Sequence, residues 1–304
     1  MAQTGQCVVT GATGYIGKYI TRALLARGAR VTTLTGHPDR PSEFGGIVEV
    51  KPFSFINPEQ LTDSLKGAHT LYNTYWIRFP MGEMTFERAV ANSRTLIRAA
   101  EEAGVRRIVH ISVTKADRAP DLPYYAGKAQ VEEVITSSKL SYAILRPNIV
   151  FGDEGILINN LAWFLRHMPV FAIPGSGEYK VQPVFVEDLA EMAVGQGESS
   201  ENVVMDAVGP EAPTFNELMD VLKRTVGSRA LIIHVPPAAA LASTLVIGKA
   251  LGDVIMTPEE VKGLLANLLV SDGPPTAPTR LSDWLAAHRD AVGRQYFSEL
   301  KRRR

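Results

Sequence analysis

The stretch CVVTGATGYIGKYI, from Cys7 to Ile20, sets three glycines between a β-branched run and an amphipathic pattern. Residues 6–10 predict a short strand, and the apolar residues that follow at helical spacing predict a helix that ends near Gly28. Glycine at such a junction permits a tight turn and a close approach of the backbone to a ligand. The three glycines of this junction are Gly11, Gly14 and Gly17.

The alternation of strand and helix patterns continues to about residue 150. Such alternation predicts a parallel sheet with helices on both faces, a doubly wound α/β fold of the Rossmann type. The expected strands are 6–10, 30–35, 47–51, 69–73, 107–112 and 142–147, and the expected helices after the first are 58–66, 83–103 and 124–138.

Proline and glycine become frequent after Phe151, where the regular alternation stops. Helix signals follow, because residues 214–217 and 257–260 each have the spacing of a capping box. We therefore expect a dinucleotide-binding Rossmann domain over residues 1–150, to which residues 181–207 return. A smaller, mostly helical substrate lobe is expected over residues 151–180 and 208–304.

Composition excludes several classes of function. The chain has 32 basic and 32 acidic side chains, so no basic field for nucleic acid or polybasic membrane surface is expected. Cys7 is the only cysteine, which favours a reducing, cytoplasmic location. The apolar stretch 237–251 is too short for a transmembrane segment and predicts a buried or groove-lining helix. No spacing of His, Cys, Asp or Glu suggests a metal site, and oligomeric state carries no sequence signal.

The glycine turn has a functional interpretation as well as a structural one. A helix that begins directly after a strand presents unpartnered N–H groups and a partial positive charge at its amino end. The glycines would let the backbone approach a pyrophosphate there, and Gly17 would let the helix pack closely on the strand.

Longer stretches resemble one known superfamily. VTGATGYIG, the helix asparagine Asn92, YYAGKAQVEEVI, ILRPNIVFG and GSGEYKVQPVFVEDLAE are similar to the short-chain dehydrogenase/reductase superfamily in its extended and atypical branches. The end, LSDWLAAHRDAVGRQYFSEL, resembles bacterial relatives of the NDUFA-nine-type accessory subunit of complex I. The resemblance implies NADP or NAD as cofactor, held by Gly11, Thr13, Gly14, Tyr15, Ile16, Gly17, Thr35, Gly36, His37, Arg40, Ser54, Asn73, Lys128, Pro147 and Asn148.

Tyr124 and Lys128 are the candidate catalytic pair, since residues four apart share one face of a helix. A neighbouring ammonium favours the phenolate form of a tyrosine and makes it usable as an acid or base near neutral pH. Ser112, at the end of the fifth strand, is the candidate for orienting the substrate oxygen. Members of the family commonly have a second hydroxyl residue next; here it is Val113, so Thr114 could substitute.

The choice between NADP and NAD depends on the end of the second strand. NAD-selective members of this fold carry an acidic residue there, whereas this chain has Thr35 and Gly36. His37 and Arg40 could reach a 2′-phosphate, so NADP is preferred over NAD. The third-strand position that often carries an adenine-binding aspartate corresponds to Ser54.

Polar and aromatic residues elsewhere could line a small-molecule substrate. Trp76 and Arg78 follow the fourth strand, Thr114 follows the fifth strand, and the others lie in or near the second lobe. The candidate substrate residues are Thr114, Trp76, Arg78, Asn148, Trp163 and Tyr179.

These features predict an NAD(P)-dependent oxidoreductase that moves a hydride between nicotinamide and a carbonyl or alcohol carbon. Two alternatives remain. The first is a non-catalytic dinucleotide-binding redox sensor or assembly factor, which the NDUFA-nine-type resemblance and Val113 support. The second is a nucleotide-sugar epimerase or dehydratase, against which the short loop from Ser112 to Tyr124 argues.

Overall fold

The computed structural model describes residues 5–303 and divides the chain into two compact units. The first unit comprises residues 1–146 and 186–206, and the second comprises residues 147–185 and 207–304. The chain thus leaves the first unit after Arg146 and returns to it at Val186, rather than at residues 150 and 181.

The first unit is built on a seven-stranded sheet in which every pair of neighbours is parallel. The strand order is β10-β6-β5-β4-β1-β2-β3, which confirms the doubly wound α/β fold. Its strands are β1 (Gln6–Thr10), β2 (Arg30–Thr35), β3 (Glu49–Pro52), β4 (Ala68–Asn73), β5 (Arg107–Ile111), β6 (Ser141–Arg146) and β10 (Val203–Asp206).

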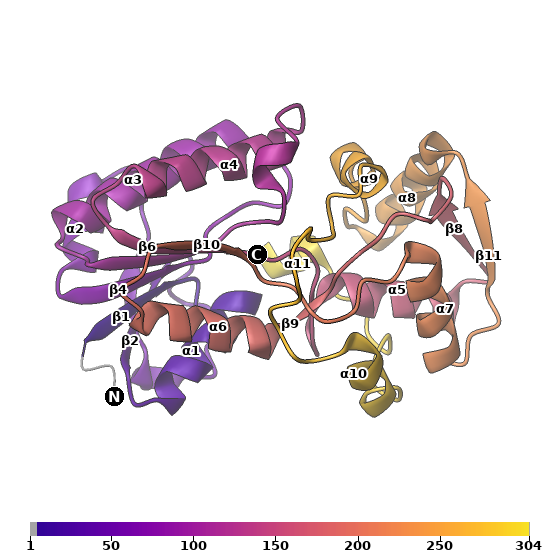
Figure 1. Cartoon of the computed structure of the whole chain (residues 1–304), viewed down its shortest axis with the longest axis horizontal. Coiled ribbons are helices and arrows are strands. Elements are labelled where there is room, and N and C mark those ends of the chain that lie inside the picture. Colours follow the sequence, from indigo (N-terminus) through magenta and orange to yellow (C-terminus); the bar gives the residue numbers. More distant parts are fainter. Residues whose placement is uncertain (1–4, 304) are drawn as a thin grey trace. The chain divides into compact units, whose positions relative to one another are not determined.

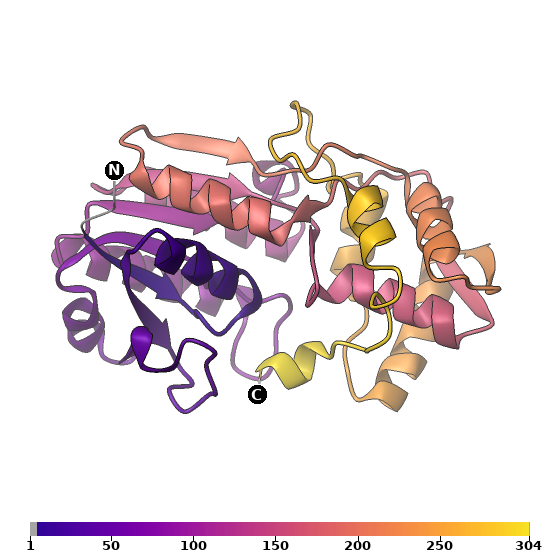
Figure 2. The same cartoon turned by 90° about the horizontal axis from the view of Figure 1, so that it is seen from below.

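Helices cover both faces of this sheet. Helices α2, α3 and α4 lie on one face and α1 and α6 on the other (Figure 1), and α1 and α6 lie side by side in the view from below (Figure 2). Leu71 and Ile108 on the strands pack with Ile97 and Val131 on the helices in the core of the α2–α4 side. The helices are α1 (Tyr15–Ala26), α2 (Pro58–Leu65), α3 (Phe86–Glu102), α4 (Pro123–Thr136) and α6 (Val186–Glu198), with short 3₁₀ turns η1 (Gly45–Ile47) and η2 (Ala116–Arg118).

Two element boundaries differ from the sequence prediction for local reasons. The third strand starts at Glu49 rather than residue 47, because residues 45–47 form the η1 turn, in which Gly45 has a φ of +52°. Helix α3 starts at Phe86 rather than residue 83, because the Thr85 hydroxyl accepts the Arg88 N–H at 3.2 Å as an N-cap.

The order of the strands fixes where a ligand can bind in the first unit. Strand β1 lies between β2 and β4, so the chain runs outward from β1 in both directions along the sheet. Ligands of such sheets bind outside the carboxyl ends of the strands at this switch point. The glycine turn after β1 and the ends of β2, β4 and β5 lie at that edge.

The second unit is mostly helical, with two small two-stranded parallel sheets. Its core gathers Phe151, Leu165, Met219, Trp284 and their neighbours. Both expected capping boxes are present, from Thr214 to Glu217 and from Thr257 to Glu260. Its elements are β7 (Val150–Phe151), α5 (Ile156–His167), β8 (Val170–Pro174), β9 (Val184–Phe185), α7 (Phe215–Thr225), β11 (Leu231–Val235), α8 (Pro237–Leu251), α9 (Pro258–Leu265), α10 (Leu281–Ala287) and α11 (Glu299–Arg303).

The expectation of a buried or groove-lining helix over residues 237–251 is confirmed for the helix and wrong for its burial. The segment forms helix α8, but only Ala240 and Gly248 are buried, whereas Leu245 and Val246 are 71% and 72% exposed. The helix is apolar all round, so packing along one side still leaves apolar side chains in solvent.

Candidate functional site

Two glycines shape the turn after β1. Gly11 has a φ of +68°, in the left-handed region that side chains disfavour, and its N–H donates to the Leu34 carbonyl at 2.9 Å. A Cβ built on Gly17 would lie 2.2 Å from the Gly11 carbonyl oxygen, far inside van der Waals contact. Helix α1 can therefore approach β1 closely only because residue 17 has no side chain.

The amino end of α1 fits an anion. Gly14 is its N-cap residue, no side chain caps the helix, and no acidic residue occupies the first turn. N–H groups in the first turn of a helix lack intrahelical partners and carry partial positive charge. Thr13, Tyr15 and Ile16 are half-buried around this end. The turn therefore suits the pyrophosphate of a dinucleotide.

The carboxyl end of β2 offers basic groups. The Thr35 hydroxyl accepts the His37 N–H at 3.0 Å and so shapes the loop that follows. Gly36 and His37 are exposed, and Arg40 is half-buried. Ser54, after β3, is also half-buried. Positions 35 and 36 carry no carboxylate that would repel a 2′-phosphate.

Asn73, at the end of β4, is fully buried and bonded within the protein. Its Oδ1 accepts the Tyr75 N–H at 3.1 Å, so its Nδ2 faces His110 Nδ1 at 3.0 Å and donates to it. The neutral His110 ring therefore carries its proton on Nε2. Burial, and then the nearby Lys128 ammonium, hold the pKa of His110 well below its usual value. His110 is a polar residue in an apolar strand, a signal that the sequence interpretation passed over.

Helix α4 positions the candidate pair. Pro123 occupies its first turn, so Tyr124 lies at the helix start and Lys128 one turn later. Lys128 is 3% exposed; its Nζ donates to the Ile111 carbonyl at 2.7 Å and lies 4.9 Å from the Trp76 ring centroid. Burial lowers the pKa of Lys128 to about 7, against an opposing effect of Glu132. The chain therefore places a lysine that can change charge near neutral pH one helical turn after Tyr124.

The Ser112 hydroxyl has a partner inside the protein. It donates to the Glu132 carboxylate, which also accepts from Arg146 with an Nε–Oε1 distance of 3.0 Å. Sequence reasoning missed both Glu132 and Arg146. The available signal was spacing, because Tyr124, Lys128 and Glu132 succeed one another every fourth residue along α4.

Trp76 lies in an aromatic cluster at this edge of the sheet. Its ring stacks on Phe86 with centroids 6.2 Å apart and meets Tyr124 edge-on at 6.1 Å. Thr114, two residues after Ser112, is fully buried. Arg78 is half-buried, and its guanidinium lies 5.6 Å from the Phe79 ring centroid. The structure thus places Trp76 in contact with Tyr124 and Lys128, whereas Arg78 lies over the ring of the next residue, Phe79.

Four further candidates belong to the second unit, each with local contacts. The Asn148 Nδ2 donates to the Leu269 carbonyl at 2.9 Å, one residue after the buried Pro147. Trp163 stacks on His167 with centroids 4.4 Å apart. Tyr179 donates to the Pro174 carbonyl, and burial raises the pKa of its hydroxyl. Tyr179 is therefore part of the core of the second unit, whereas Asn148 and Trp163 are half-buried.

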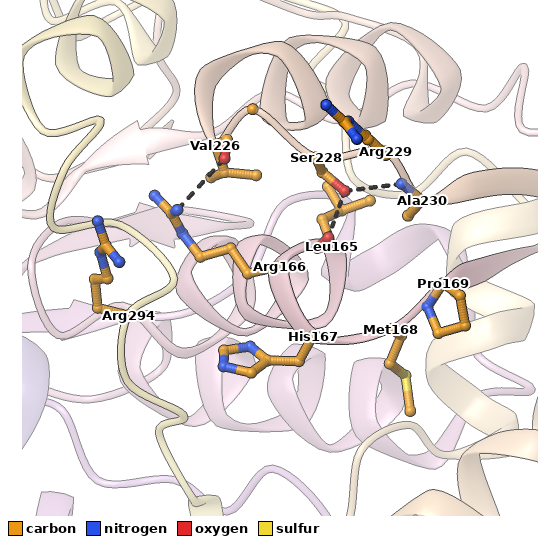
Figure 3. A pocket seen from close by; sticks show the side chains of 11 residues that line it. Leu165, Arg166, His167, Met168, Pro169, Val226, Ser228, Arg229, Ala230 and Arg294 are labelled. Carbon is orange, nitrogen blue, oxygen red and sulfur yellow. Dashed lines mark hydrogen bonds between the residues drawn. The ribbon is translucent and has the colours of Figure 1, made fainter.

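A pocket of about 680 Å³ lies within the second unit, lined by the carboxyl end of α5, the segments that follow α5 and α7, and Arg294. Figure 3 shows Arg166 reaching toward the Val226 carbonyl, to which its guanidinium donates at 3.4 Å. It also donates to the carbonyls of Val292 and Arg289, at 3.0 and 2.8 Å. The guanidinium therefore satisfies carbonyl groups of the fold, including one at the end of α7.

Residues 5–303 contain no group of three or more His, Cys, Asp or Glu side chains placed to hold a metal ion. Over the same residues, no helix has the length and hydropathy to cross a membrane.

Comparison with known proteins bears on the nucleotide-binding part of the chain. Residues 11–158 match a family model described as NAD(P)H-binding. This match indicates an NAD(P)H-binding domain that is similar to those of atypical short-chain dehydrogenase/reductases. It is similar to the 40 kDa subunit of mitochondrial NADH-ubiquinone oxidoreductase from Neurospora crassa, with 26% identity over 84% of this chain and 69% of that protein.

Two solved structures share the fold of this chain. The NADPH complex of an NADPH-dependent quinone oxidoreductase from Escherichia coli aligns with a TM-score of 0.74 and 23% identity, over 92% of this chain and 99% of that one. A nucleoside-diphosphate-sugar epimerase from Staphylococcus aureus aligns with a TM-score of 0.69 and 18% identity, over 92% and 99%. At these identities the likeness concerns the fold, whereas the match over residues 11–158 indicates NAD(P)H binding.

Proposed function

We propose that the protein is an NAD(P)H-dependent oxidoreductase that interconverts a carbonyl and an alcohol of a small molecule. The observation that carries this proposal is the Tyr124–Lys128 pair, with a lysine whose pKa lies at about 7. A lysine that is charged at and below neutral pH can stabilise the phenolate of a tyrosine on the same helix face, which helps that tyrosine to act as an acid or base. A protein that only bound a dinucleotide would have less need of the tyrosine hydroxyl at this place.

In carbonyl reduction, each of the residues Tyr124, Lys128 and Ser112 has a separate role. Bound nicotinamide supplies a hydride to the carbonyl carbon. Tyr124 gives its hydroxyl proton to the carbonyl oxygen, which completes the alcohol, and then regains a proton from solvent. The Lys128 ammonium stabilises the phenolate that remains. Because the Ser112 hydroxyl donates to Glu132, we assign Ser112 to holding α4 against β5 rather than to the substrate.

We further propose NADP as the preferred cofactor. The end of β2 carries His37 and Arg40 but no carboxylate at positions 35 and 36. A 2′-phosphate gains from a guanidinium, and a carboxylate would repel it. The structurally similar quinone oxidoreductase is itself NADPH-dependent, which supports the same preference.

One observation favours a second function, a dinucleotide-binding protein without turnover. The Lys128 Nζ donates to a backbone carbonyl and is covered by the Trp76 ring. In this arrangement the lysine points into the fold. The similarity to a subunit of a respiratory enzyme supports this alternative as well.

The test is a screen of carbonyl compounds, alcohols and nucleotide sugars against NADPH, NADH and their oxidised forms. Any hit is then measured with Tyr124→Phe and with Tyr125→Phe, a matched control at the neighbouring position. We expect turnover to fall about 100-fold in the first variant and a few-fold at most in the control, with cofactor affinity unchanged in both. Full turnover in Tyr124→Phe would exclude this tyrosine as the proton donor. Tight NADPH binding with no hit would favour the binding protein.

A further inference from the structure

A buried donor at the candidate site has no acceptor. Among the residues that the structure describes, the Trp76 Nε1 is buried and makes no hydrogen bond. The indole of tryptophan is a donor only, and buried donors are almost always satisfied by protein, water or ligand. The Trp76 N–H therefore needs a hydrogen-bond acceptor, which a bound ligand would supply.

The Trp76 ring is held in place, so it cannot easily turn toward another acceptor. One face packs on Phe86, and the Lys128 Nζ lies 4.9 Å from the ring centroid. Its six-membered ring fits against Gly127, where an added Cβ would lie 2.9 Å from Cη2. Packing against α3 and α4 thus fixes where the N–H points.

A second orphan donor lies in the same neighbourhood. His110 Nε2, which carries the proton of the neutral ring, is buried with no hydrogen-bond partner in the described part of the chain. Lys128 lies close enough to lower the pKa of His110. Around Lys128 the fold therefore offers two unpartnered N–H donors as well as the lysine itself. Such a neighbourhood suits a ligand that brings acceptor oxygens.

We propose that the Trp76 indole N–H donates a hydrogen bond to the substrate carbonyl oxygen and selects planar, conjugated carbonyl compounds. This inference rests on the proposed function. Trp76 and Tyr124 are half-buried, and their rings meet edge-on with centroids 6.1 Å apart, so the indole lies next to the ring whose hydroxyl is the proposed proton donor. The walls they form are aromatic, which suits a flat ring system. Ser112, the other candidate for this oxygen, donates to Glu132.

The proposal distinguishes ligand classes by chemistry. Aromatic faces and isolated donors match a quinone or aryl ketone, whose carbonyl oxygens accept hydrogen bonds and whose rings stack. A sugar carries many hydroxyl groups, each of which also needs an acceptor, and the indole and imidazole N–H groups supply none.

The experiment measures binding rather than turnover. The full chain is saturated with NADP⁺ and titrated by calorimetry with 1,4-naphthoquinone, and separately with naphthalene, which has the same ring shape without the oxygens. Trp76→Phe keeps an aromatic ring and removes the N–H; Trp163→Phe, in the second unit, is the matched control. We expect Trp76→Phe to weaken naphthoquinone binding about tenfold, which corresponds to about 1.4 kcal/mol. Naphthalene and NADP⁺ affinities should stay unchanged.

A second variant guards against misfolding of the first. Gly127→Ala improves helix propensity and pushes on the six-membered ring of Trp76, so it should also weaken naphthoquinone selectively. Equal naphthoquinone affinities in wild type and Trp76→Phe would overturn the proposal, as would equal losses for naphthoquinone and naphthalene. Failure of the wild type to bind naphthoquinone would overturn the ligand class. Trp76-dependent binding without any turnover would sustain this inference while the proposed reaction failed.

Discussion

The glycine turn after β1 and the Lys128 neighbourhood at the β5–α4 edge lie in the same unit but are specified in different ways. The turn depends on what is missing, because Gly11 needs its positive φ and Gly17 has no room for a Cβ. The Lys128 neighbourhood depends on which side chains come together, since Trp76, His110 and Glu132 arrive from three separate elements.

This difference explains what a sequence can reveal. A backbone-specified site leaves a local pattern of glycines at a strand–helix junction, and position in the chain is enough to recognise it. A site specified by side chains leaves only single residues at unrelated positions. Variants at Gly11 or Gly17 should therefore disturb the backbone of the turn itself, whereas a variant at Gly14, whose φ is −79°, should change cofactor binding more than folding. Variants near Lys128 should affect stability and specificity together.

The largest effect is expected at the turn itself, from Gly14→Asp. Gly14 is the N-cap residue of α1, a place where aspartate is favoured, but an added Cβ would lie 3.1 Å from the Gly11 carbonyl oxygen. These two effects oppose each other, so the chain should still fold, with a small change in the free energy of unfolding. The new carboxylate would occupy the place of the pyrophosphate and repel it, and dinucleotide affinity should fall at least about 100-fold. Calorimetric titration with NADPH and NADH, beside a urea unfolding curve, measures both quantities.

Gly46→Asp is the matched control for that variant. Gly46 lies in the exposed η1 turn, and an added Cβ there has nothing within 4 Å. The same charge should leave dinucleotide affinity within a few-fold. Unchanged affinity in Gly14→Asp would refute binding at the turn, and an equal loss in both variants would point to net charge instead.

The next largest effect concerns the buried Lys128, which should make the free energy of unfolding of the protein depend on pH. Burial lowers the pKa of Lys128 from 10.5 to about 7, so between these values the unfolded chain binds the proton and the folded chain does not. Stability from this group is then lost as pH falls from about 10 to about 7, and the loss is complete below 7. Relative to Lys128→Met, wild type should gain about 1.4 kcal/mol of unfolding free energy per pH unit over this window.

Urea unfolding of both proteins at several values between pH 7 and pH 9.5 measures this slope. Lys139→Met, which removes an exposed lysine after α4, serves as the control and should follow wild type at every pH. A constant difference between wild type and Lys128→Met across the window would show that the lysine is not held neutral by burial.

Much of the fold followed from the sequence because its signals are local. The strand over residues 30–35 and the two capping boxes were predicted with the observed bounds. Helix α8 shows the limit, since an apolar run predicts a helix but does not say how many of its sides find partners. The role of Ser112 could not be predicted for a similar reason. No residue near it in the sequence indicates that Glu132, twenty residues later, accepts a hydrogen bond from its hydroxyl.

Ser112→Ala tests that contact and should have a smaller effect. Loss of a hydrogen bond to a carboxylate that still pairs with Arg146 should cost about 1–2 kcal/mol of unfolding free energy. Turnover of any substrate found should stay within a few-fold. Thr114→Val is measured beside it, because Thr114 is the other hydroxyl at this strand end. Unchanged stability with a 100-fold loss of turnover in Ser112→Ala would return Ser112 to the substrate oxygen.

The smallest effect is expected at the end of β2, where we propose that cofactor preference is decided. Arg40 is half-buried and lies beyond the exposed Gly36 and His37, so its guanidinium would interact with a 2′-phosphate across solvent. Interactions of this kind are screened and contribute modestly, which makes a three- to fivefold loss of NADPH affinity a reasonable size for Arg40→Gln. NADH affinity should not change, because the 2′-hydroxyl carries no charge.

Arg30→Gln, at the opposite end of the same strand, removes an equal charge far from the ribose and should affect neither cofactor. The selective loss should shrink as ionic strength rises from 20 to 500 mM on the scale set by Debye screening. If Arg40→Gln weakens NADPH and NADH equally, or if wild type binds NADH at least tenfold more tightly, the preference for NADP is wrong, whereas the glycine turn would still hold the pyrophosphate of either cofactor.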